Sequence, residues 1–420
     1  MKKTLGFFRR PELGIGWLFV ITCVLFAYAM FQGGFVSWFL FYGILPIFLY
    51  VVSVAVYPLE KVQVERSLAG EVFTAGAKLV VTVDIYRKSR LPLLFLVVED
   101  RLPGTLAGTA RAEMKDYRFG AKAIFFPGFR QSLRYRYTLE PLPRGEFSLS
   151  EFELKIGDAF GWFEKSRIAL TDQQLLVYPA FEEIHHWDPQ ERHEEGERRG
   201  KNLFQFDLTS VSGVRDYSTG DRLSWVDWKS TARTNKLLTK EFERPLNEDF
   251  VICLDRRADH FRGRADWFET GVSAAASMVR YGMKKGGSVG FVSCGKEKGI
   301  YPLASDSHQQ WRIFHHLAMV QPDGTGNPFP LLIQSLRRFP AKVNVIFITS
   351  VVSDATLRLF DEMQRRNQKA DLFLLSESSS SAREDFRVER LRRTGVGVYM
   401  IGNGNLSEVL NMGSHYATNG

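Results

Sequence analysis

The feature that most constrains this 420-residue sequence is an uncharged run near its N-terminus. From Leu13 to Leu59 there is no Asp, Glu, Lys, Arg or His. A membrane-spanning helix needs about 20 apolar residues, so this run is long enough for two crossings. Gln32-Gly33-Gly34 interrupts the run, which predicts helices over 15–31 and 35–57 joined by a tight turn. We therefore expect residues 1–59 to form a membrane hairpin.

A cleaved signal peptide is the alternative for the first apolar stretch, because it also begins with basic residues. A second long apolar run follows at once, which favours the hairpin. Lys2, Lys3, Arg9 and Arg10 precede the first helix, whereas the turn carries no cation. The positive-inside rule then predicts that both termini lie in the cytoplasm and that the lipid bilayer is a partner.

Residues 60–180 predict a β-rich, sandwich-like domain. The stretches 78–86 and 132–139 alternate polar with apolar residues, as half-buried strands do. Proline and glycine punctuate the intervals between such stretches, which indicates turns. Short strands at this spacing are typical of a small sandwich.

Residues 249–420 show a different pattern, in which apolar strands alternate with helical periodicity. The stretch 250–254 is continuously apolar, 343–349 is mostly apolar, and 266–285 has the period of a helix. This alternation predicts an α/β domain with a mainly parallel sheet that is covered on both faces. In such sheets, binding sites lie at the carboxyl ends of the strands.

Residues 181–248 predict a charged linker followed by a dense motif. The linker, 181–202, is rich in both charge signs, which indicates an exposed segment. His185, His186 and His193 fall within it, but their spacing matches no familiar metal motif, so we expect solvated side chains.

The motif begins at Gly213 and contains a predicted helix. Gly220 suits a turn, and Asp221 can cap a helix that begins at the next residue. On that helix, Lys229 and Arg233 are four residues apart and share one face. Two adjacent cations repel each other, so they require an anionic partner.

Two interpretations of these cations compete. In a structural one, they pair with Asp216, Asp227 or Glu241, and the tryptophans of the motif fill core. In a functional one, they join Arg215 to bind a phosphate, a carboxylate or an acidic partner surface. Ion-pair networks are commoner than binding sites, so residues alone favour the structural role.

The same motif resembles the signature of a bacterial membrane family whose shared domain is known only as domain of unknown function number fifty-eight. The order of segments also matches that family: two membrane helices, a β-rich segment, the signature and an α/β region. The stretch 157–163 is similar to the family's Asp-Pro-Phe-Gly-Leu sequence, with Ala159 in place of proline. The signature positions matched here are Gly213, Arg215, Asp216, Tyr217, Gly220, Asp221, Trp228, Lys229, Ser230 and Arg233.

The resemblance implies a role but no reaction. Members of the family usually occur beside MoxR-type AAA+ ATPases and transglutaminase-like membrane proteins, which makes both kinds of protein candidate partners. Their α/β region is similar to a von Willebrand factor type A domain. The resemblance therefore implies a multi-pass protein of the bacterial plasma membrane, acting as an adaptor or assembly protein with such an ATPase. A sensor or enzyme that binds an anionic small molecule through residues 213–233 is the alternative.

The resemblance to type A domains also implies a position where a metal site could occur. Such domains often carry Asp-x-Ser-x-Ser after their first strand, and here Arg257 and Asp259 replace the two serines behind Asp255. Thr349-Ser350 stands where Thr-Asp is common. A guanidinium supplies no ligand to magnesium. We expect a degenerate site without metal, in which Arg257 pairs with Asp255.

Nothing else in the sequence predicts catalysis, so we expect no cofactor and favour a non-enzymatic protein. Cys253 and Cys294 fall in apolar strands with no histidine placed beside them by a motif. Ser230 and Lys229 are adjacent on the predicted helix and point about 100° apart. There is no Walker motif. The net charge of +8 suits an anionic leaflet, and no long basic run or RNA-binding motif indicates nucleic acid.

Overall fold

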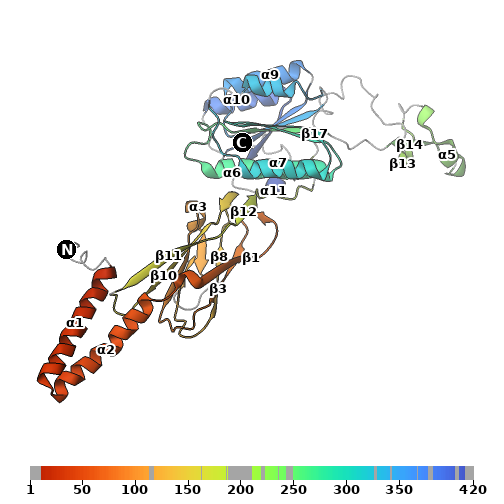
Figure 1. Cartoon of the computed structure of the whole chain (residues 1–420). Coiled ribbons are helices and arrows are strands. Elements are labelled where there is room, and N and C mark those ends of the chain that lie inside the picture. Colours follow the sequence, from red (N-terminus) through yellow and green to blue (C-terminus); the bar gives the residue numbers. More distant parts are fainter. Residues whose placement is uncertain are drawn as a thin grey trace. The chain divides into compact units, whose positions relative to one another are not determined.

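The structure is a computed structural model, and it divides the chain into two compact units, Met1–Tyr178 and Pro179–Gly420 (Figure 1). The described residues are 11–112, 118–161, 163–185, 187, 211–218, 223–234, 236–242, 249–325, 329–340, 343–366, 368–376, 382–402 and 406–411.

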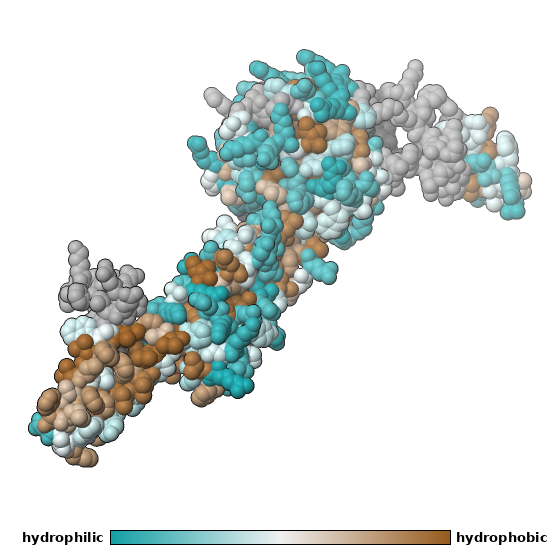
Figure 2. Space-filling model, in the orientation of Figure 1, coloured by the Kyte–Doolittle hydropathy of each residue, from teal (hydrophilic) through white to brown (hydrophobic). Residues whose placement is uncertain are grey.

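The first unit begins with a helical hairpin of α1 (Pro11–Gln32) and α2 (Phe35–Ala55). Gly33 adopts a φ of +64°, a conformation that favours glycine, and so allows the tight turn between them. Both helices are long and apolar enough to cross a membrane. Figure 2 shows their largely apolar surface. The predicted hairpin is present, although α1 begins at Pro11 rather than at residue 15.

Aromatic side chains connect the two helices. Phe19 lies 6.0 Å from Phe48 between ring centroids, and Phe26 lies 5.3 Å from Phe41. Because one partner number rises while the other falls, the helices are antiparallel.

The rest of the first unit is β-rich, as predicted. Two sheets with the strand orders β1-β3-β8-β5 and β11-β10-β4-β7-β6 enclose one hydrophobic core, and β2-β12-β9 forms a third. The alternation predicted for 78–86 is present, since residues of β3 are buried at every second position. The elements are η1 (Leu59–Lys61), β1 (Val62–Leu68), β2 (Phe73–Thr74), β3 (Leu79–Arg87), β4 (Leu96–Asp100), α3 (Gly104–Ala107), β5 (Ala110–Ala112), β6 (Arg118–Phe119), β7 (Lys122–Phe125), β8 (Ser132–Leu139), β9 (Gly145–Ser148), β10 (Glu151–Gly157), β11 (Glu164–Leu170) and β12 (Gln174–Tyr178).

A buried ion pair lies in this core. Arg66 Nη2 lies 2.5 Å from Asp100 Oδ1, and both side chains are at most 1% exposed. The Tyr137 hydroxyl donates to Asp100 Oδ2 at 2.6 Å. Burial and the carboxylate of Asp100 both raise the pKa of Tyr137, so its hydroxyl keeps its proton.

The second unit contains the predicted α/β domain. Its sheet has the order β17-β16-β15-β18-β19-β20 and is parallel apart from β17. Figure 1 shows α6 and α7 on one face and α9 and α10 on the other. The elements are β15 (Phe250–Asp255), α6 (Ala265–Lys284), β16 (Val289–Cys294), β17 (Lys298–Ala304), α7 (Ser307–Met319), α8 (Phe329–Leu336), β18 (Asn344–Thr349), α9 (Asp354–Arg365), β19 (Ala370–Leu375), α10 (Ala382–Arg393), β20 (Gly397–Ile401) and α11 (Leu406–Asn411).

The start of the segment predicted as an exposed linker is instead packed on this domain. Trp187 is 4% exposed, and its indole N–H donates to the Tyr399 hydroxyl at 2.9 Å. The Tyr281 hydroxyl donates to the carbonyl of Trp187 at 2.7 Å. The interpretation as a linker was wrong here because an indole buries much apolar area. His185 is exposed, and the other two histidines lie outside the described residues.

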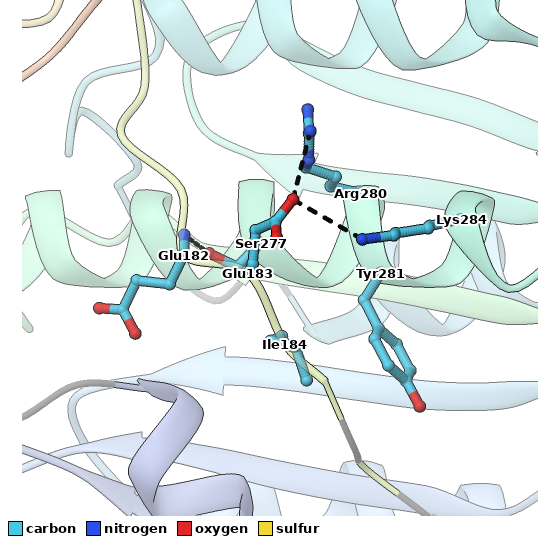
Figure 3. A pocket seen from close by; sticks show the side chains of 7 residues that line it. All are labelled: Glu182, Glu183, Ile184, Ser277, Arg280, Tyr281 and Lys284. Atoms are coloured by element: carbon cyan, nitrogen blue, oxygen red, sulfur yellow. Dashed lines mark hydrogen bonds and ion pairs between the residues drawn. The ribbon is translucent and has the colours of Figure 1, made fainter.

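Polar contacts fix the same segment on helix α6 (Figure 3). The backbone N–H of Glu182 donates to Ser277 Oγ at 2.9 Å. The carboxylate of Glu183 lies 3.6 Å from Arg280 Nη2 and 3.7 Å from Lys284 Nζ. The cavity between these groups measures about 10 Å³, barely the space of one water molecule, so it is no ligand site.

Candidate functional site

The order of the parallel strands reverses between β15 and β18, because β16 lies on one side of β15 and β18 lies on the other. In open α/β sheets, ligands bind at the carboxyl ends of the strands beside such a switch point. Asp255 ends β15, and Thr349 ends β18. Their side chains meet, since Thr349 Oγ1 donates to Asp255 Oδ2 at 2.7 Å.

A histidine that was not predicted completes this group. His260 Nδ1 lies 2.6 Å from Asp255 Oδ2, and the Ser350 hydroxyl donates to the carbonyl of His260 at 2.8 Å. If the carboxylate is ionised it only accepts hydrogen bonds, and the donor in this contact is then the His260 Nδ1–H. The side chains of Asp255 and His260 are 1% and 6% exposed. We call Asp255, His260, Thr349 and Ser350 the strand-end cluster.

The predicted pairing of Arg257 with Asp255 is wrong. The Arg257 guanidinium instead pairs with Asp259, where its Nε lies 3.0 Å from Oδ1, and this contact lowers the pKa of Asp259. Only the backbone N–H of Arg257 reaches Asp255, donating to Oδ1 at 3.0 Å. Asp259 is two residues from Arg257 and more exposed than Asp255. Pairing with Asp259 therefore avoids burying the Arg257 charge beside Asp255.

The neighbouring Arg256 fixes the loops around the cluster. It is 4% exposed and donates to Asp323 Oδ1 at 2.8 Å and to the carbonyls of Gln321 and Glu297 at 3.0 Å. Burial lowers the pKa of its guanidinium, and Asp323 opposes that shift. A Cβ at Gly295 would lie 2.5 Å from the guanidinium carbon, so only glycine fits there.

Both carboxylate oxygens of Asp255 are therefore in hydrogen-bond contact with groups of the chain. Three of them converge on it: a backbone N–H, a hydroxyl and an imidazole N–H. Within the described part of the chain, no group of three or more His, Cys, Asp or Glu side chains is arranged to hold a metal ion.

Of the candidate nucleophiles, Cys253 is buried and Cys294 is partly buried. Burial raises the pKa of Cys253 well above its usual value and also raises that of Cys294, which disfavours both thiolates. The structure also reveals a Ser–His pair, in which Ser293 Oγ lies 2.7 Å from His316 Nε2. Burial, followed by Arg256, lowers the pKa of His316 to about 4, so the ring is neutral at pH 7. Ser293 is 0% exposed, which denies a substrate access to its hydroxyl.

The signature residues form a separate, small module. Strands β13 (Val211–Asp216) and β14 (Leu238–Phe242) pair antiparallel, and they flank η2 (Leu223–Trp225) and helix α5 (Trp228–Thr234). The backbone N–H of Asp227 donates to the carbonyl of Leu238 at 2.9 Å, and the N–H of Leu238 donates to Thr231 Oγ1 at 3.0 Å. These bonds fasten α5 to β14. We call residues 211–242 the signature module, of which 219–222 and 235 lie outside the described residues.

Helix α5 begins later than predicted. Asp227 caps it, because Asp227 Oδ1 accepts from the backbone N–H groups of Lys229 and Ser230 at 3.0 and 3.1 Å. These N–H groups, Ser230 first, lower the pKa of the Asp227 carboxyl. Gly220 and Asp221, which we predicted as turn and cap, lie outside the described residues.

The module exposes one of its tryptophans and two of its cations. Trp228 is 64% exposed, so it does not fill core. Lys229 and Arg233 lie on the same short helix and are exposed, and neither has an ion pair among the described residues. Arg215 donates to the backbone carbonyl of Asp216 at 3.1 Å and also has further interactions.

The two groups predicted from sequence thus occupy different places. Gly213, Arg215, Asp216 and Tyr217 lie on or beside β13, whereas Trp228, Lys229, Ser230 and Arg233 lie on α5. Asp255, Arg257 and Asp259 lie at and just after the end of β15. The hydrogen bonds described for the signature stay within residues 213–242, and those of the strand-end cluster connect β15, β18 and the loop 256–260.

Comparison with known proteins agrees with the signature. Residues 213–375 match the model of the family described as protein of unknown function DUF58. The chain belongs to this family. It is 31% identical over 403 residues to the uncharacterized protein YeaD of Bacillus subtilis (strain 168), covering 94% of this chain and 98% of YeaD.

Similarities to solved structures are weak. The pilus adhesin SpaC from Lactobacillus rhamnosus GG, in its open conformation, matches 39% of this chain with a TM-score of 0.28 and 11% identity. This chain spans 28% of that adhesin's length. The bacterial hydrophobin BslA matches 26% of this chain, over 96% of its own length, with a TM-score of 0.18 and 11% identity. Neither likeness informs the function.

Proposed function

We propose that this protein is a membrane-anchored, cytoplasm-facing adaptor that binds a partner protein through the signature module. The observation that carries the proposal is the exposed helix α5. It presents Trp228 at 64% exposure beside the exposed cations Lys229 and Arg233. Tryptophan and arginine are enriched among the residues that contribute most binding energy at protein interfaces. The two charges select a partner with an acidic surface.

Exposure within the module is consistent with this role. Val226 is 3% exposed and Thr239 is 0% exposed, and these two residues form a β-bridge, whereas helix α5 itself has no buried residue. The module also exposes the apolar side chains of Leu223 (67%) and Leu237 (44%). An apolar centre with cations beside it has the composition of a binding surface rather than of a core.

The strand-end cluster supports a non-enzymatic function. Asp255 directs its carboxylate at donors of its own chain, and Ser293 is inaccessible. We propose that the α/β domain is a von Willebrand type A-like domain whose metal position is degenerate. The support is the meeting of Asp255 with Thr349 at the strand ends, together with Arg257 and Asp259 in place of the expected serines.

The membrane anchor completes the proposal. Helices α1 and α2 cross the plasma membrane as a hairpin, and the basic residues before α1 keep both termini in the cytoplasm. The partner is an AAA+ ATPase of the MoxR type, with a transglutaminase-like membrane protein as a second component. This pairing is supported by the family resemblance alone.

Affinity purification of the full chain from solubilised membranes, with and without ATP, tests the adaptor role. We expect an AAA+ ATPase to be recovered, in an amount that changes with ATP. Recovery of no ATPase in either condition would refute the proposal that the protein is an adaptor for an AAA+ ATPase.

A second candidate function rests on the same exposed cations. Lys229 and Arg233 could bind a phosphate-bearing small molecule, which would make the protein a sensor or an enzyme. In that case inorganic phosphate raises the melting temperature of the wild-type chain but not of the Lys229→Gln/Arg233→Gln variant. An absence of any phosphate-dependent shift argues against this candidate.

A further inference from the structure

A buried arginine, Arg87, bonds the chain just after helix α2 to the β-rich domain. Arg87, at the end of β3, is 3% exposed, and its Nε donates to the Tyr57 hydroxyl at 2.8 Å. On the opposite edge, Arg167 Nη1 donates to the carbonyls of Leu59 and Glu60 at 3.0 and 2.6 Å. Tyr57 and Leu59 are both 0% exposed in the domain's core. The helix therefore enters this domain at a fixed position.

The same arginine holds two loops beside the helix end. Arg87 Nη2 donates to the carbonyl of Leu91 at 2.7 Å, and its Nη1 donates to the carbonyl of Arg130 at 2.9 Å. Leu93 and Gly128 exchange two backbone hydrogen bonds, of 3.0 and 2.9 Å, that join these loops to each other. The loops 88–95 and 126–131 thus lie at the level where α2 ends.

These two loops expose large apolar side chains and carry only positive charge. Phe126 is 61% exposed and Phe129 is 76% exposed, while Leu91 and Leu94 are 43% and 46% exposed. The loops contain Lys88, Arg90 and Arg130, which are all exposed, and no Asp or Glu.

A third loop reaches the same end of the domain. Strand β10 packs against α2, and the loop that follows it exposes Phe160 at 53%. Buried Asp158 holds this loop, accepting from the backbone N–H groups of Phe160 and Phe163 at 2.8 and 2.5 Å. The loop position is therefore set by the fold rather than by Phe160 itself.

We infer that this end of the β-rich domain is a second membrane-contact surface, in which Phe126, Phe129 and Phe160 enter the interface of the inner leaflet. The inference rests on the membrane hairpin of the proposed function. If α2 spans the bilayer, its last residues lie at the membrane surface, and loops bonded to Tyr57 lie there too. Aromatic rings favour this zone, and Lys88, Arg90 and Arg130 match anionic headgroups.

This membrane-contact surface would fix the orientation of the β-rich domain relative to the bilayer. A helix alone can tilt and rotate within a bilayer, because tilt is set by packing and by interfacial anchors. Three phenylalanines, on two loops near the helix end, supply such anchors on the domain. The β-rich domain would then contact the inner leaflet directly and would not be connected to it by the helices alone.

Fluorescence depth measurement on the full chain in anionic vesicles tests the inference. An environment-sensitive fluorescent amino acid is introduced by nonsense suppression at position 129 and, separately, at Leu170. Leu170 is a matched control, because it is 79% exposed at the opposite end of β11 from the loop that carries Phe160. A third site, Leu40 within α2, reports whether the hairpin is in the bilayer.

We expect quenching by nitroxide-labelled lipids at positions 129 and 40 but not at 170. Quenching at 40 without quenching at 129 would overturn this inference and leave the hairpin intact. No quenching at 40 would overturn the membrane anchor itself. A label at Phe126 repeats the test should the first variant fold poorly, and vesicles without anionic lipid should weaken the quenching at both loop positions. Quenching unaffected by anionic lipid would refute the role assigned to the three cations.

Discussion

The substitution Asp255→Ala is expected to destabilise the α/β domain strongly. Three donors converge on this carboxylate: the Arg257 N–H at 3.0 Å, the Thr349 hydroxyl at 2.7 Å and the His260 ring at 2.6 Å. Alanine leaves all of them facing a methyl group in a site that is 4% exposed. Each buried donor left unsatisfied costs about 1–3 kcal/mol, and the rotatable hydroxyl can recover part of its share. We expect a loss of about 3–5 kcal/mol.

Thermal unfolding of the detergent-solubilised chain, followed by tryptophan fluorescence, measures this loss. Each kcal/mol lowers the melting temperature of a domain of this size by about 2–4 °C, so the decrease should be roughly 10 °C. Thr349→Val is the graded control, because it removes one of the three donors at nearly constant shape and should cost about 1 kcal/mol.

Two results would refute this reasoning. A loss below about 1 kcal/mol for Asp255→Ala would mean that the three hydrogen bonds do not hold the strand ends together. A rise in melting temperature with Mg²⁺ or Mn²⁺ in the wild-type chain, abolished by Asp255→Ala, would mean that the carboxylate is a metal ligand. The strand-end cluster would then be a functional metal site rather than a structural hydrogen-bond network.

Three further predictions concern buried groups. Asp100→Ala should destabilise the β-rich domain by about 3–5 kcal/mol in denaturant unfolding, because the Arg66 charge is left unpaired in the core, and a cost near zero would contradict the pairing. Folding lowers the pKa of His316 from 6.5 to about 4. The neutral ring therefore stabilises the fold fully above pH 6.5, and this stabilisation is lost as the pH falls toward 4. The loss amounts to about 3 kcal/mol in the free energy of unfolding. His316→Gln should flatten that dependence, and an equal slope in both proteins would show that other groups titrate. Trp187→Ala should cost about 3–5 kcal/mol in the α/β domain, and an unchanged melting temperature would mean that the segment is not packed there in solution.

The hairpin and the main strands could be predicted from sequence because each has a strong local signal. The uncharged run up to Leu59 leaves few structures other than two long apolar helices, and alternation over 132–139 marks a strand with one buried face. Strand β17 and helix α8 were not predicted, since Lys298–Ala304 carries mixed polarity and Phe329–Leu336 is short and contains a proline. The antiparallel edge of the sheet was missed with β17.

The candidate site was predicted only in part because its contacts depend on how loops fold. Asp255 and Thr349 could be expected at neighbouring strand ends, and the structure places them in hydrogen-bond contact. His260 has no motif around it, and its position follows from the turn after Asp255. The Ser293–His316 pair joins a strand to a helix 23 residues away in sequence, which no local pattern could reveal.

The signature module is another case, in which the motif could be predicted from sequence but the start of its helix could not. The sequence favoured internal ion pairs because ion-pair networks are commoner than binding sites. The structure uses the acidic Asp227 as a helix cap instead, which leaves Lys229 and Arg233 exposed without an ion pair among the described residues. Capping and ion pairing draw on the same carboxylate, and sequence spacing does not decide between them.

The central claim is that Lys229 and Arg233 of the signature module bind a partner rather than stabilise the fold by internal ion pairs. The Lys229→Gln/Arg233→Gln variant tests this claim most directly. The measurement is recovery of the partner ATPase by the full chain, with the free energy of unfolding determined on the same protein. The variant Arg358→Gln/Lys369→Gln is the matched control, since it removes the same charges from exposed positions elsewhere. We predict lost recovery for the signature variant only, with stability within about 0.5 kcal/mol of wild type. Undiminished recovery, or a loss of stability that accounts for the lost recovery, would contradict the claim.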